Sequence, residues 1–405
     1  MRAVTRPLRD PVDLNDVAGR DGMLFVRNAI GFAGRGCAAR VPADAAPELL
    51  ADIEHVDHVG DTPGPIAIGA IPFLPGSSAE LTVPATLVGK DAAGRAWMTT
   101  VGDDIDDGSA GDGGGAPGVL DDVTRTVGAA TATYRIGALV ATDHYLAAVS
   151  AARDAVRAGE LTKAVVARPV LVESDEPIDV HAVLHRLKAS FGASYRYSID
   201  GLVGASPELL VEVDGETVRS HPLAGTAPRT GDPDRDTELA ERLVASTKDQ
   251  VEHRVVIEMV HDTLLPWVSF LDWEPEPSIV TVANVQHLGS AVQGRLSRPG
   301  PSVVELVRAL CPTPALGGHP RDAALDLITA VEGFERGRYG GAVGWVDARG
   351  NGTWAVTIRC AELSDDRRSA RLVAGGGIVA DSDPRAELAE TQAKLQAMLS
   401  ALVRP

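Results

Sequence analysis

The sequence predicts an α+β fold, in which antiparallel hairpins alternate with inserted helices. Residues 20–100 alternate short apolar runs with turn residues, a pattern typical of a strand-rich meander. Asp200-Gly201, Asp214-Gly215 and Gly350-Asn351-Gly352 each separate two apolar runs and predict hairpin turns. No glycine-rich dinucleotide fingerprint follows a predicted strand, which argues against a parallel Rossmann sheet.

The remaining elements follow from the spacing of apolar residues and from cap and turn residues. The segment 102–118 is rich in Asp and Gly and predicts a flexible acidic loop. In order, we expect a helix from Asp143 to Gly159, a strand over 163–172, a helix over 179–191, strands over 194–200, 202–213 and 216–225, a long helix from Ser246, strand structure over 278–296, helices over 302–310 and 321–332, a hairpin over 338–363, a strand over 370–379 and a helix from Pro384 onward.

Composition argues against several classes of function. The chain has 405 residues, is 44% hydrophobic and carries a net charge of −18 without a run of Lys or Arg. Neither nucleic acid nor an anionic membrane is therefore an expected partner. The three cysteines, Cys37, Cys311 and Cys360, lie far apart and predict neither a disulfide framework nor a zinc knuckle. With no apolar leader and no run of membrane-span length, we expect a soluble cytoplasmic protein.

Two helix starts carry paired carboxylates. Glu387 and Glu390 are three residues apart at the start of the C-terminal helix, and Asp249 and Glu252 have the same spacing after Ser246. If the two starts face each other, four carboxylates converge, and their mutual repulsion requires a cation or trapped protons. An all-oxygen cluster of this kind suits Mg²⁺.

Each acidic pair also has an ordinary structural interpretation. Acids in a first helical turn interact favourably with the helix dipole. Glu390 and Lys394 are four residues apart, as in a surface ion pair. Either helix alone is therefore as well explained by a solvated face, and the metal hypothesis depends on the rest of the chain.

Lys163 and Glu208 are candidate proton-transfer residues. Lys163 opens an apolar strand, where it could be a charged residue protecting a sheet edge or a base whose charged form burial disfavours. Glu208 follows Pro207 at the start of another apolar run. It could be a surface residue, or a carboxyl that a low-dielectric pocket keeps protonated and able to act as an acid.

Several polar residues in predicted strands are candidate ligands for an anion. Arg359 lies in the middle of the alternating run AVTIRCAEL and needs an anionic partner if buried, either a substrate carboxylate or a structural acid. His287 and Tyr339 could contact a ligand or make core hydrogen bonds.

Glycine-rich segments lie beside both acidic helices. Bare backbone amides bind anions by close approach, although a turn without a ligand has the same composition. The positions concerned are Gly225 with Thr226, and Gly375, Gly376 and Gly377.

Taken together, the motifs resemble those of the chorismate-utilising enzymes, which include isochorismate, salicylate, anthranilate and aminodeoxychorismate synthases. The resemblance runs from about Asp143 to the end, and the first 140 residues match only loosely. Its motifs are KAVVAR (163–168), GASPELL (204–210), PLAGTAPR (222–229), KDQVEH (248–253), VQHLGS (285–290), CPTPALGGHP (311–320), ERGRYGGAVGW (335–345), TIRC (357–360) and AGGGIVADSDPRAELAET (374–391).

The resemblance implies a single large domain of two antiparallel sheets packed as a sandwich, with helices outside. Residues 1–140 would form a variable part of that sandwich, and 141–405 the chorismate-binding catalytic core. Mg²⁺ would bridge a chorismate carboxylate to Glu252 and Glu390, with Asp249 and Glu387 holding metal-bound water. The implied substrate-binding residues are Ala224, Gly225, Thr226, His287, Thr313, Tyr339, Arg359, Gly375, Gly376, Gly377 and Lys394.

Within the family, the residues most resemble isochorismate synthases. Amine-adding relatives usually carry glutamine at the position of Lys163, and aminodeoxychorismate enzymes carry lysine at that of Ala224. The implied reaction adds water at C2 of chorismate with Lys163 as base, while Glu208 protonates the departing C4 hydroxyl. A salicylate synthase and an inactive homologue are the alternatives, and menaquinone and siderophore pathways both stay open. We expect a monomer without a glutaminase subunit.

Overall fold

Two large β-sheets dominate the computed structural model, which describes residues 1–103, 105 and 132–403. Among these residues, the only parallel pairing joins β1 to β5, and all others are antiparallel. The first sheet contains, in spatial order, β10 (Tyr134–Ala138), β11 (Lys163–Ser174), β25 (Ser369–Ile378), β24 (Cys360–Leu363), β13 (Leu202–Ser206), β12 (Tyr195–Ile199), β2 (Met23–Arg27), β3 (Ile30–Arg35), β8 (Thr86–Lys90), β9 (Ala96–Gly102), β1 (Arg2–Pro7) and β5 (Glu54–Asp57), with β21 (Gly318–His319) beside β11.

The second sheet and a small third sheet complete the strands. The second contains, in order, β17 (Val268–Trp273), β20 (Val292–Leu296), β15 (Thr217–His221), β14 (Leu209–Asp214), β23 (Gly352–Val356), β22 (Ala342–Asp347), β6 (Ile66–Ile71), β7 (Glu80–Val83) and β4 (Ala39–Pro42). The third contains β16 (Leu223–Pro228), β19 (Val285–Gly289) and β18 (Ser278–Thr281).

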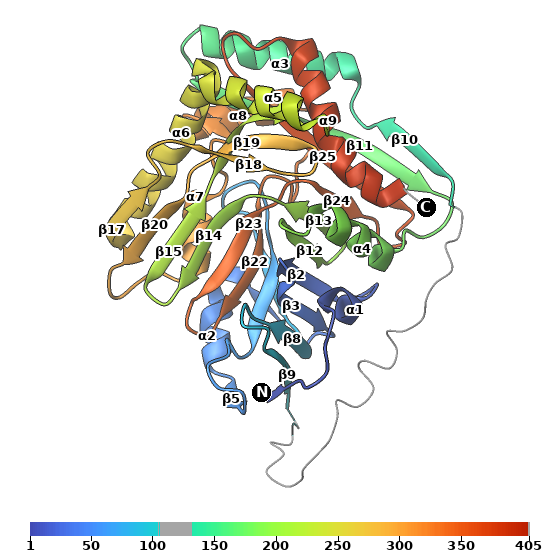
Figure 1. Ribbon diagram of the computed structural model, residues 1–405, viewed down its shortest axis with the longest axis vertical. Coiled ribbons are helices and arrows are strands. Elements are labelled where there is room, and N and C mark those ends of the chain that lie inside the picture. Colours follow the sequence, from blue (N-terminus) through green and yellow to red (C-terminus); the bar gives the residue numbers. More distant parts are fainter. Residues whose placement is uncertain (104, 106–131, 404–405) are drawn as a thin grey trace.

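Helices are inserted between the strands and gather towards one end of the molecule, where α3, α5, α8 and α9 lie (Figure 1). They are α1 (Leu14–Ala18), α2 (Ala46–Ala51), α3 (Thr142–Arg157), α4 (Val180–Phe191), α5 (Pro233–Ala245), α6 (Thr247–Leu264), α7 (Val303–Leu310), α8 (Arg321–Val331) and α9 (Pro384–Val403), with short 3-10 turns at Ala43–Ala45 and Leu265–Trp267.

The main core lies between the two large sheets. Tyr197 of β12 and Trp354 of β23 belong to the same apolar cluster, and neither is measurably exposed to solvent. Helices cover the outer face of the first sheet, where Leu187 of α4 and Leu395 of α9 pack against Leu372 of β25 in a second cluster. Each such buried side chain stabilises the fold by about 1.5–3 kcal/mol. The predicted α+β sandwich with helices outside is confirmed.

Residues before position 103 extend both large sheets rather than forming a separate layer. Strand β2 pairs with β12 in the first sheet, and β6 pairs with β22 in the second. Most of the N-terminal part therefore shares its sheets with the rest of the chain.

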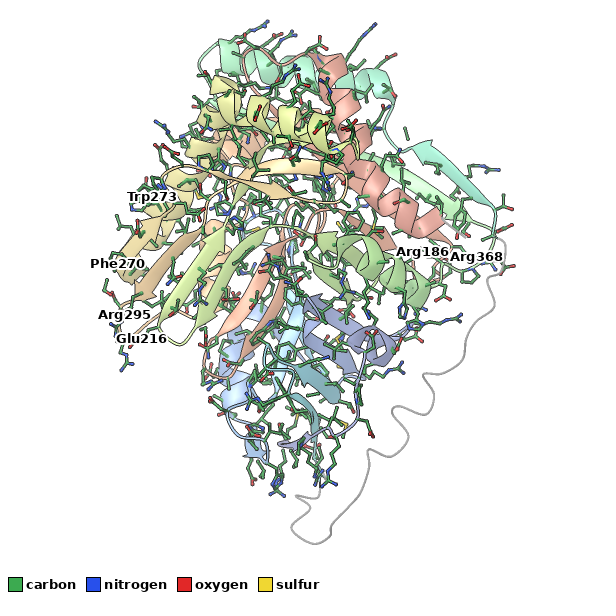
Figure 2. The ribbon with its side chains drawn as sticks, in the orientation of Figure 1. Arg186, Glu216, Phe270, Trp273, Arg295 and Arg368 are labelled. Atoms are coloured by element: carbon green, nitrogen blue, oxygen red, sulfur yellow. The ribbon has the colours of Figure 1, made fainter. Side chains whose placement is uncertain are left out.

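The second sheet ends at the edge strand β17. Phe270 and Trp273 of this strand are exposed at the periphery of the molecule (Figure 2). Beside them Arg295 of β20 forms a 2.6 Å ion pair with Glu216. Charges of this kind oppose pairing with another edge.

The predicted hairpins are confirmed at Asp200-Gly201, Gly215 and Gly350, where each turn contains positive φ angles. The prediction for Arg359 is wrong in one respect. Arg359 is not inside a strand but lies between β23 and β24 with φ of 53°, a turn conformation that interrupts the alternating pattern.

Two further expectations need comment. The long helix from Ser246 is confirmed as α6, but the preceding helix α5 was not predicted. The predicted acidic loop over 102–118 falls mostly outside the described residues. Among the residues that are described, no helix is both long and apolar enough to cross a membrane.

Candidate active site

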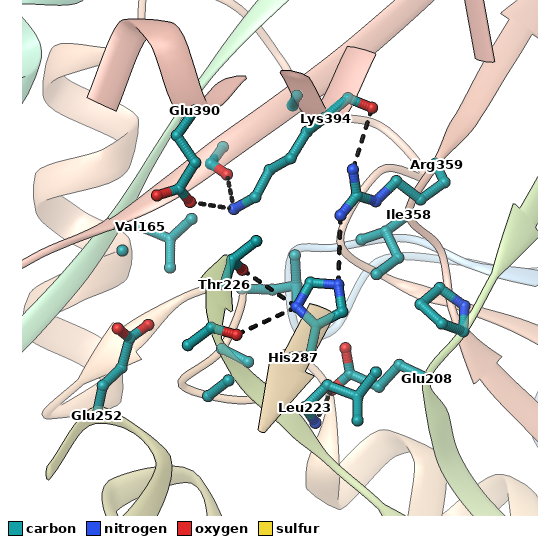
Figure 3. Close-up of a pocket in the computed structure, with 18 of the residues that line it drawn as sticks. Val165, Glu208, Leu223, Thr226, Glu252, His287, Ile358, Arg359, Glu390 and Lys394 are labelled. Atoms are coloured by element: carbon teal, nitrogen blue, oxygen red, sulfur yellow. Dashed lines mark hydrogen bonds and ion pairs between the residues drawn. The ribbon is translucent and has the colours of Figure 1, made fainter. Parts of the chain in front are cut away.

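A cavity open to solvent lies where the third sheet, β25, α6 and α9 come together (Figure 3). Most of the site residues predicted from the sequence line it: Glu208, Ala224, Gly225, Thr226, Asp249, Glu252, His287, Tyr339, Arg359, Gly375, Gly377, Glu390 and Lys394. The other four predicted residues, Lys163, Thr313, Gly376 and Glu387, are not among the residues that line it.

Lys163 is buried directly behind the lining of the cavity. Its side chain is 2% exposed, and its Nζ lies 2.6 Å from Oε1 of Glu252 on α6. Strand β11 pairs with β25 so that Val165 faces Gly377, and the absence of a side chain at Gly377 leaves room for the ion pair. Lys163 is therefore a buried residue held by a carboxylate, and the edge-protection alternative is wrong.

Glu208 is a buried acid that faces the cavity. Its side chain is 2% exposed, because residue 208 lies between β13 and β14 in the interior of the sandwich. The backbone N–H of Leu223 donates a 3.4 Å hydrogen bond to its Oε1. Burial raises the pKa of Glu208 to about 8, although this hydrogen bond and Lys163 oppose the shift. Near neutral pH the carboxyl is therefore protonated and can donate a proton.

The four predicted metal ligands come from the starts of α6 and α9. Ser246 caps α6 by accepting a 3.2 Å hydrogen bond from the backbone N–H of Asp249. The carboxylates of Glu252 and Glu390 point into the same part of the cavity (Figure 3). The four acids do not form a closed cage, since no three of their carboxylate oxygens lie within 4.8 Å of one another.

The cage is open because three of the acids turn towards other groups. Glu252 pairs with Lys163, and Glu390 pairs with Lys394 at 2.6 Å. Glu387 accepts a 2.8 Å hydrogen bond from Ser382. The four acids thus lie in one region of the structure, but the four carboxylates that were expected to converge do not form one closed group.

The acidic region nevertheless fits a hard divalent cation. Burial, together with the negative charges of Glu252 and Glu390, raises the pKa of Asp249. Burial and Glu390 likewise raise the pKa of Glu387. For Glu390 burial acts in the same direction, but Lys394 outweighs it and the pKa is lowered. The four acids offer only oxygen donors, and such donors suit Mg²⁺.

Arg359 and His287 line the cavity beside each other. The Arg359 guanidinium donates to the backbone oxygen of Lys394 at 3.1 Å and lies 3.5 Å from Nε2 of His287. Nδ1 of His287 lies 3.2 Å from the carbonyl oxygen of Gly225, which can only accept, so Nδ1 carries the proton and Nε2 accepts from Arg359. Burial and the charges of Arg359 and Lys394 lower the pKa of His287 to about 3.

The guanidinium of Arg359 is left without a carboxylate partner. No Asp or Glu among the described residues lies within 4.0 Å of it, and burial lowers its pKa to about 10. Tyr339 also lines the cavity, and burial raises its pKa to about 12, so its hydroxyl stays neutral. A cation and a neutral hydroxyl at the cavity surface are suited to a carboxylate ligand.

The predicted glycines lie against the acidic helices, whereas Thr313 lies outside the cavity lining. A Cβ at Gly376 would lie 2.6 Å from Oε2 of Glu387, and one at Gly225 would lie 3.2 Å from Cβ of Asp249. Both glycines therefore allow the acidic helices to approach closely. Thr313 is buried without a hydrogen-bond partner for its hydroxyl among the described residues and does not line the cavity.

Two groups near the site were not identified from the sequence. Lys248 lines the cavity, and its Nζ lies 4.0 Å from Oε1 of Glu387. Arg336 and Glu332 form a buried ion pair that also binds the backbone of β11, through Val165 O and Ala167 N. The i,i+4 spacing of Glu332 and Arg336 was visible, but the same spacing is common on helix surfaces.

Comparison with known proteins identifies the family of the chain that forms this cavity. The family model described as "Chorismate binding enzyme" matches residues 122–403. The chain belongs to the chorismate-binding enzyme family. The prediction that it resembles chorismate-utilising enzymes is thereby confirmed.

Relatives of this chorismate-binding enzyme include isochorismate synthases. The isochorismate synthase DhbC of Bacillus subtilis is 40% identical over 281 residues, which cover 67% of this chain and 70% of the relative. The solved structure of DhbC from Bacillus anthracis has a TM-score of 0.79 at 32% identity and covers 96% of this chain and 98% of its own. MenF of Escherichia coli, a menaquinone-specific isochorismate synthase, has a TM-score of 0.83 at 24% identity, covers 100% of this chain and 94% of its own, and supports the fold alone.

Proposed function

We propose that this protein is an isochorismate synthase, which converts chorismate to isochorismate. The observation that carries the proposal is that a buried protonated acid, Glu208, lines the cavity, while a buried lysine, Lys163, lies directly behind the cavity lining. Hydroxyl exchange on the chorismate ring needs one group that takes a proton from water and one that gives a proton to the leaving hydroxyl. The similarity to the Bacillus subtilis isochorismate synthase supports the same assignment.

In the proposed mechanism, Lys163 takes a proton from the water adding at C2. Glu252, 2.6 Å from its Nζ, then holds the ammonium that results. Glu208 gives its proton to the hydroxyl departing from C4, which leaves as water. The carboxylate of Glu208 regains a proton from solvent, and Lys163 loses one, so each turnover balances.

In this proposal the acids of α6 and α9, namely Glu252, Glu390, Asp249 and Glu387, would hold Mg²⁺. When bound, the ion supplies positive charge that neutralises the ring carboxylate of chorismate. Gly375 and Gly225 both line the cavity, and their backbone amides can support that carboxylate.

The decisive experiment incubates the purified protein with chorismate and Mg²⁺ and separates the products by chromatography. Isochorismate is expected with Mg²⁺, and a chelator should stop its formation until Mg²⁺ is restored. Salicylate and pyruvate without a second enzyme would instead identify a salicylate synthase. Thermal stabilisation by chorismate without any product would identify an inactive homologue.

Arg359 is expected to bind the enolpyruvyl carboxylate together with Tyr339. Replacing it by Arg359→Lys should raise KM for chorismate by about 10- to 100-fold, because a bidentate charge-assisted contact is lost. The value of kcat should change much less. Arg95→Lys, at an exposed ion pair with Asp91, is the matched control and should leave KM unchanged. A loss confined to kcat would contradict this role.

Gly377 should tolerate no side chain. A Cβ there would lie 2.6 Å from Oε1 of Glu252 and 2.9 Å from Cε of Lys163. Gly377→Ala is therefore expected to displace the ion pair and lower kcat/KM by about 100-fold. Gly137→Ala, where a Cβ would meet nothing within 4 Å, is the control. Equal kcat/KM values in the two variants would show that the geometry around Lys163 does not limit turnover.

We also propose that the enzyme acts without a glutaminase subunit, since water rather than ammonia is its nucleophile. We propose in addition that it acts as a monomer. Isochorismate is the starting point of both menaquinone and siderophore synthesis, so the proposal ends at that product.

A further inference from the structure

A second cluster of metal-binding side chains lies on α1 and α4, outside the cavity. His181 and His185 are four residues apart on α4, so their imidazoles leave the same face of the helix. Asp16 reaches them from α1, which packs beside α4 (Figure 1). Asp13 caps α1, and Asp179 caps α4 by accepting from the backbone N–H of His181, so both short helices are fixed at their starts.

The three ligand atoms form a nearly equilateral triangle. Nε2 of His181 and Nε2 of His185 each lie 2.9 Å from the same oxygen, Oδ1 of Asp16. The two nitrogens lie 3.0 Å from each other. In a tetrahedral zinc site with bonds of about 2.0–2.1 Å, neighbouring ligand atoms are roughly 3.3 Å apart, so a small opening of the triangle would admit the ion.

No arrangement of protons satisfies all three contacts at once. If both Nε2 atoms carry protons and donate to Asp16, two N–H groups oppose each other across 3.0 Å. If only one carries a proton, the lone pair of the other faces the lone pairs of Oδ1 across 2.9 Å. A cation at the centre accepts all three lone pairs together and removes the conflict.

We propose that Asp16, His181 and His185 bind one divalent transition-metal ion, for which Zn²⁺ is the representative. Two imidazoles with one carboxylate select this class over Mg²⁺, which prefers oxygen ligands. None of the three residues lines the acidic cavity. Their side chains are 28–43% exposed, so water can complete the coordination and the ion can enter from solvent.

The site joins two parts of the chain that are distant in sequence. Asp16 belongs to the N-terminal part, and the histidines belong to a helix of the region matched by the chorismate-binding family. An ion bound only by the folded state stabilises that state, with a dependence on metal concentration. The ion would therefore fasten α1 to α4 and raise the melting temperature without entering the reaction.

Zinc stoichiometry tests the proposal directly. Protein without a histidine tag is stripped with a chelator, dialysed against Zn²⁺ in the presence of excess Mg²⁺, and analysed for metal. The wild type is expected to retain one equivalent more Zn²⁺ than His185→Gln or Asp16→Asn. His261→Gln is the matched control, because His261 also lies 3.0 Å from a carboxylate but has no second histidine in its cluster. It should retain the full wild-type amount.

Two further measurements keep the test decisive. Zn²⁺ should raise the melting temperature of the wild type more than that of Asp16→Asn, whose amide keeps the shape of the carboxylate. Co²⁺ should give visible absorption in the wild type that His181→Gln diminishes. Equal zinc content and equal thermal shifts in wild type and variants would overturn the proposal, as would a wild type that binds no additional ion.

Discussion

The variant Glu208→Gln is expected to lose about 10²- to 10⁴-fold in kcat for conversion of chorismate to isochorismate, because the amide cannot give a proton to the C4 hydroxyl. The amide oxygen can still accept from Leu223 N–H, so the fold should survive. The control is Glu212→Gln, which removes a carboxylate outside the cavity that pairs with Arg219 and accepts a hydrogen bond from Thr353. Product chromatography at saturating chorismate measures the effect, and wild-type turnover in Glu208→Gln would refute the assigned role.

The same residue gives the enzyme a characteristic pH dependence. Because Glu208 must be protonated to act as an acid, kcat of the wild type should fall as the pH rises above about 8, the pKa that burial confers on it. The profile is measured as initial rates across the alkaline range. An alkaline limb unchanged in position in Glu208→Gln would mean that another group is responsible.

Stability should depend on pH through the same carboxyl. The pKa of Glu208 is about 8 in the folded state, whereas its ordinary value, which applies to the unfolded chain, is 4.5. Between these two pH values the folded state therefore keeps a proton that the unfolded state has lost. The wild type should therefore lose stability relative to Glu208→Gln as the pH rises from 4.5 to 8, by up to about 5 kcal/mol. Urea unfolding of both proteins at the two ends of this range compares them.

Replacement of Lys163 should have a second large effect. Lys163→Gln can still hydrogen-bond to Glu252 but cannot take a proton from water, so kcat should fall by about 10²- to 10⁴-fold. Lys90→Gln, at the half-buried end of β8 and outside the cavity lining, is the control and should be fully active. Turnover is measured with saturating chorismate and Mg²⁺.

Chemical rescue separates a base from a residue that only supports Glu252. In Lys163→Ala, small primary amines added to the assay should restore part of the activity, whereas they should have no effect on Glu208→Gln. Normal turnover in Lys163→Gln would contradict the proposed role. If amines fail to restore activity in a folded Lys163→Ala variant, Lys163 positions other groups and does not transfer the proton.

Most of the fold could be predicted from local patterns. The turns at Asp200-Gly201 and Gly350 need positive φ angles that Gly and Asp adopt readily, and the start of α6 needs only the Ser246 cap. Arg359 shows the limit of such patterns. Its neighbours alternate as in a strand, but its own backbone turns at φ of 53° so that the guanidinium faces the cavity.

The sequence indicated which residues make up the site, but not how their side chains are arranged in space. Residue types and the family resemblance located Lys163 and Glu252, yet their ion pair joins positions 89 residues apart and depends on how β11 and α6 meet. The cluster on α4 shows the same limit. The spacing of His181 and His185 is visible in the sequence. Asp16, however, is 165 residues away from the nearer histidine, so only the fold brings the three side chains together.

The insertion of the first strands into both large sheets bears on how this region can vary in evolution. The main-chain hydrogen bonds that β2 and β6 give to β12 and β22 can come from any residue except proline, whereas nearly all side chains of both strands are buried and apolar. Exchanges among apolar residues of similar size are thus the substitutions expected there, while loss of the whole segment would expose two unpaired strand edges and promote aggregation. We therefore expect the sequence of this segment to vary among relatives while its strands keep their places in the sheets.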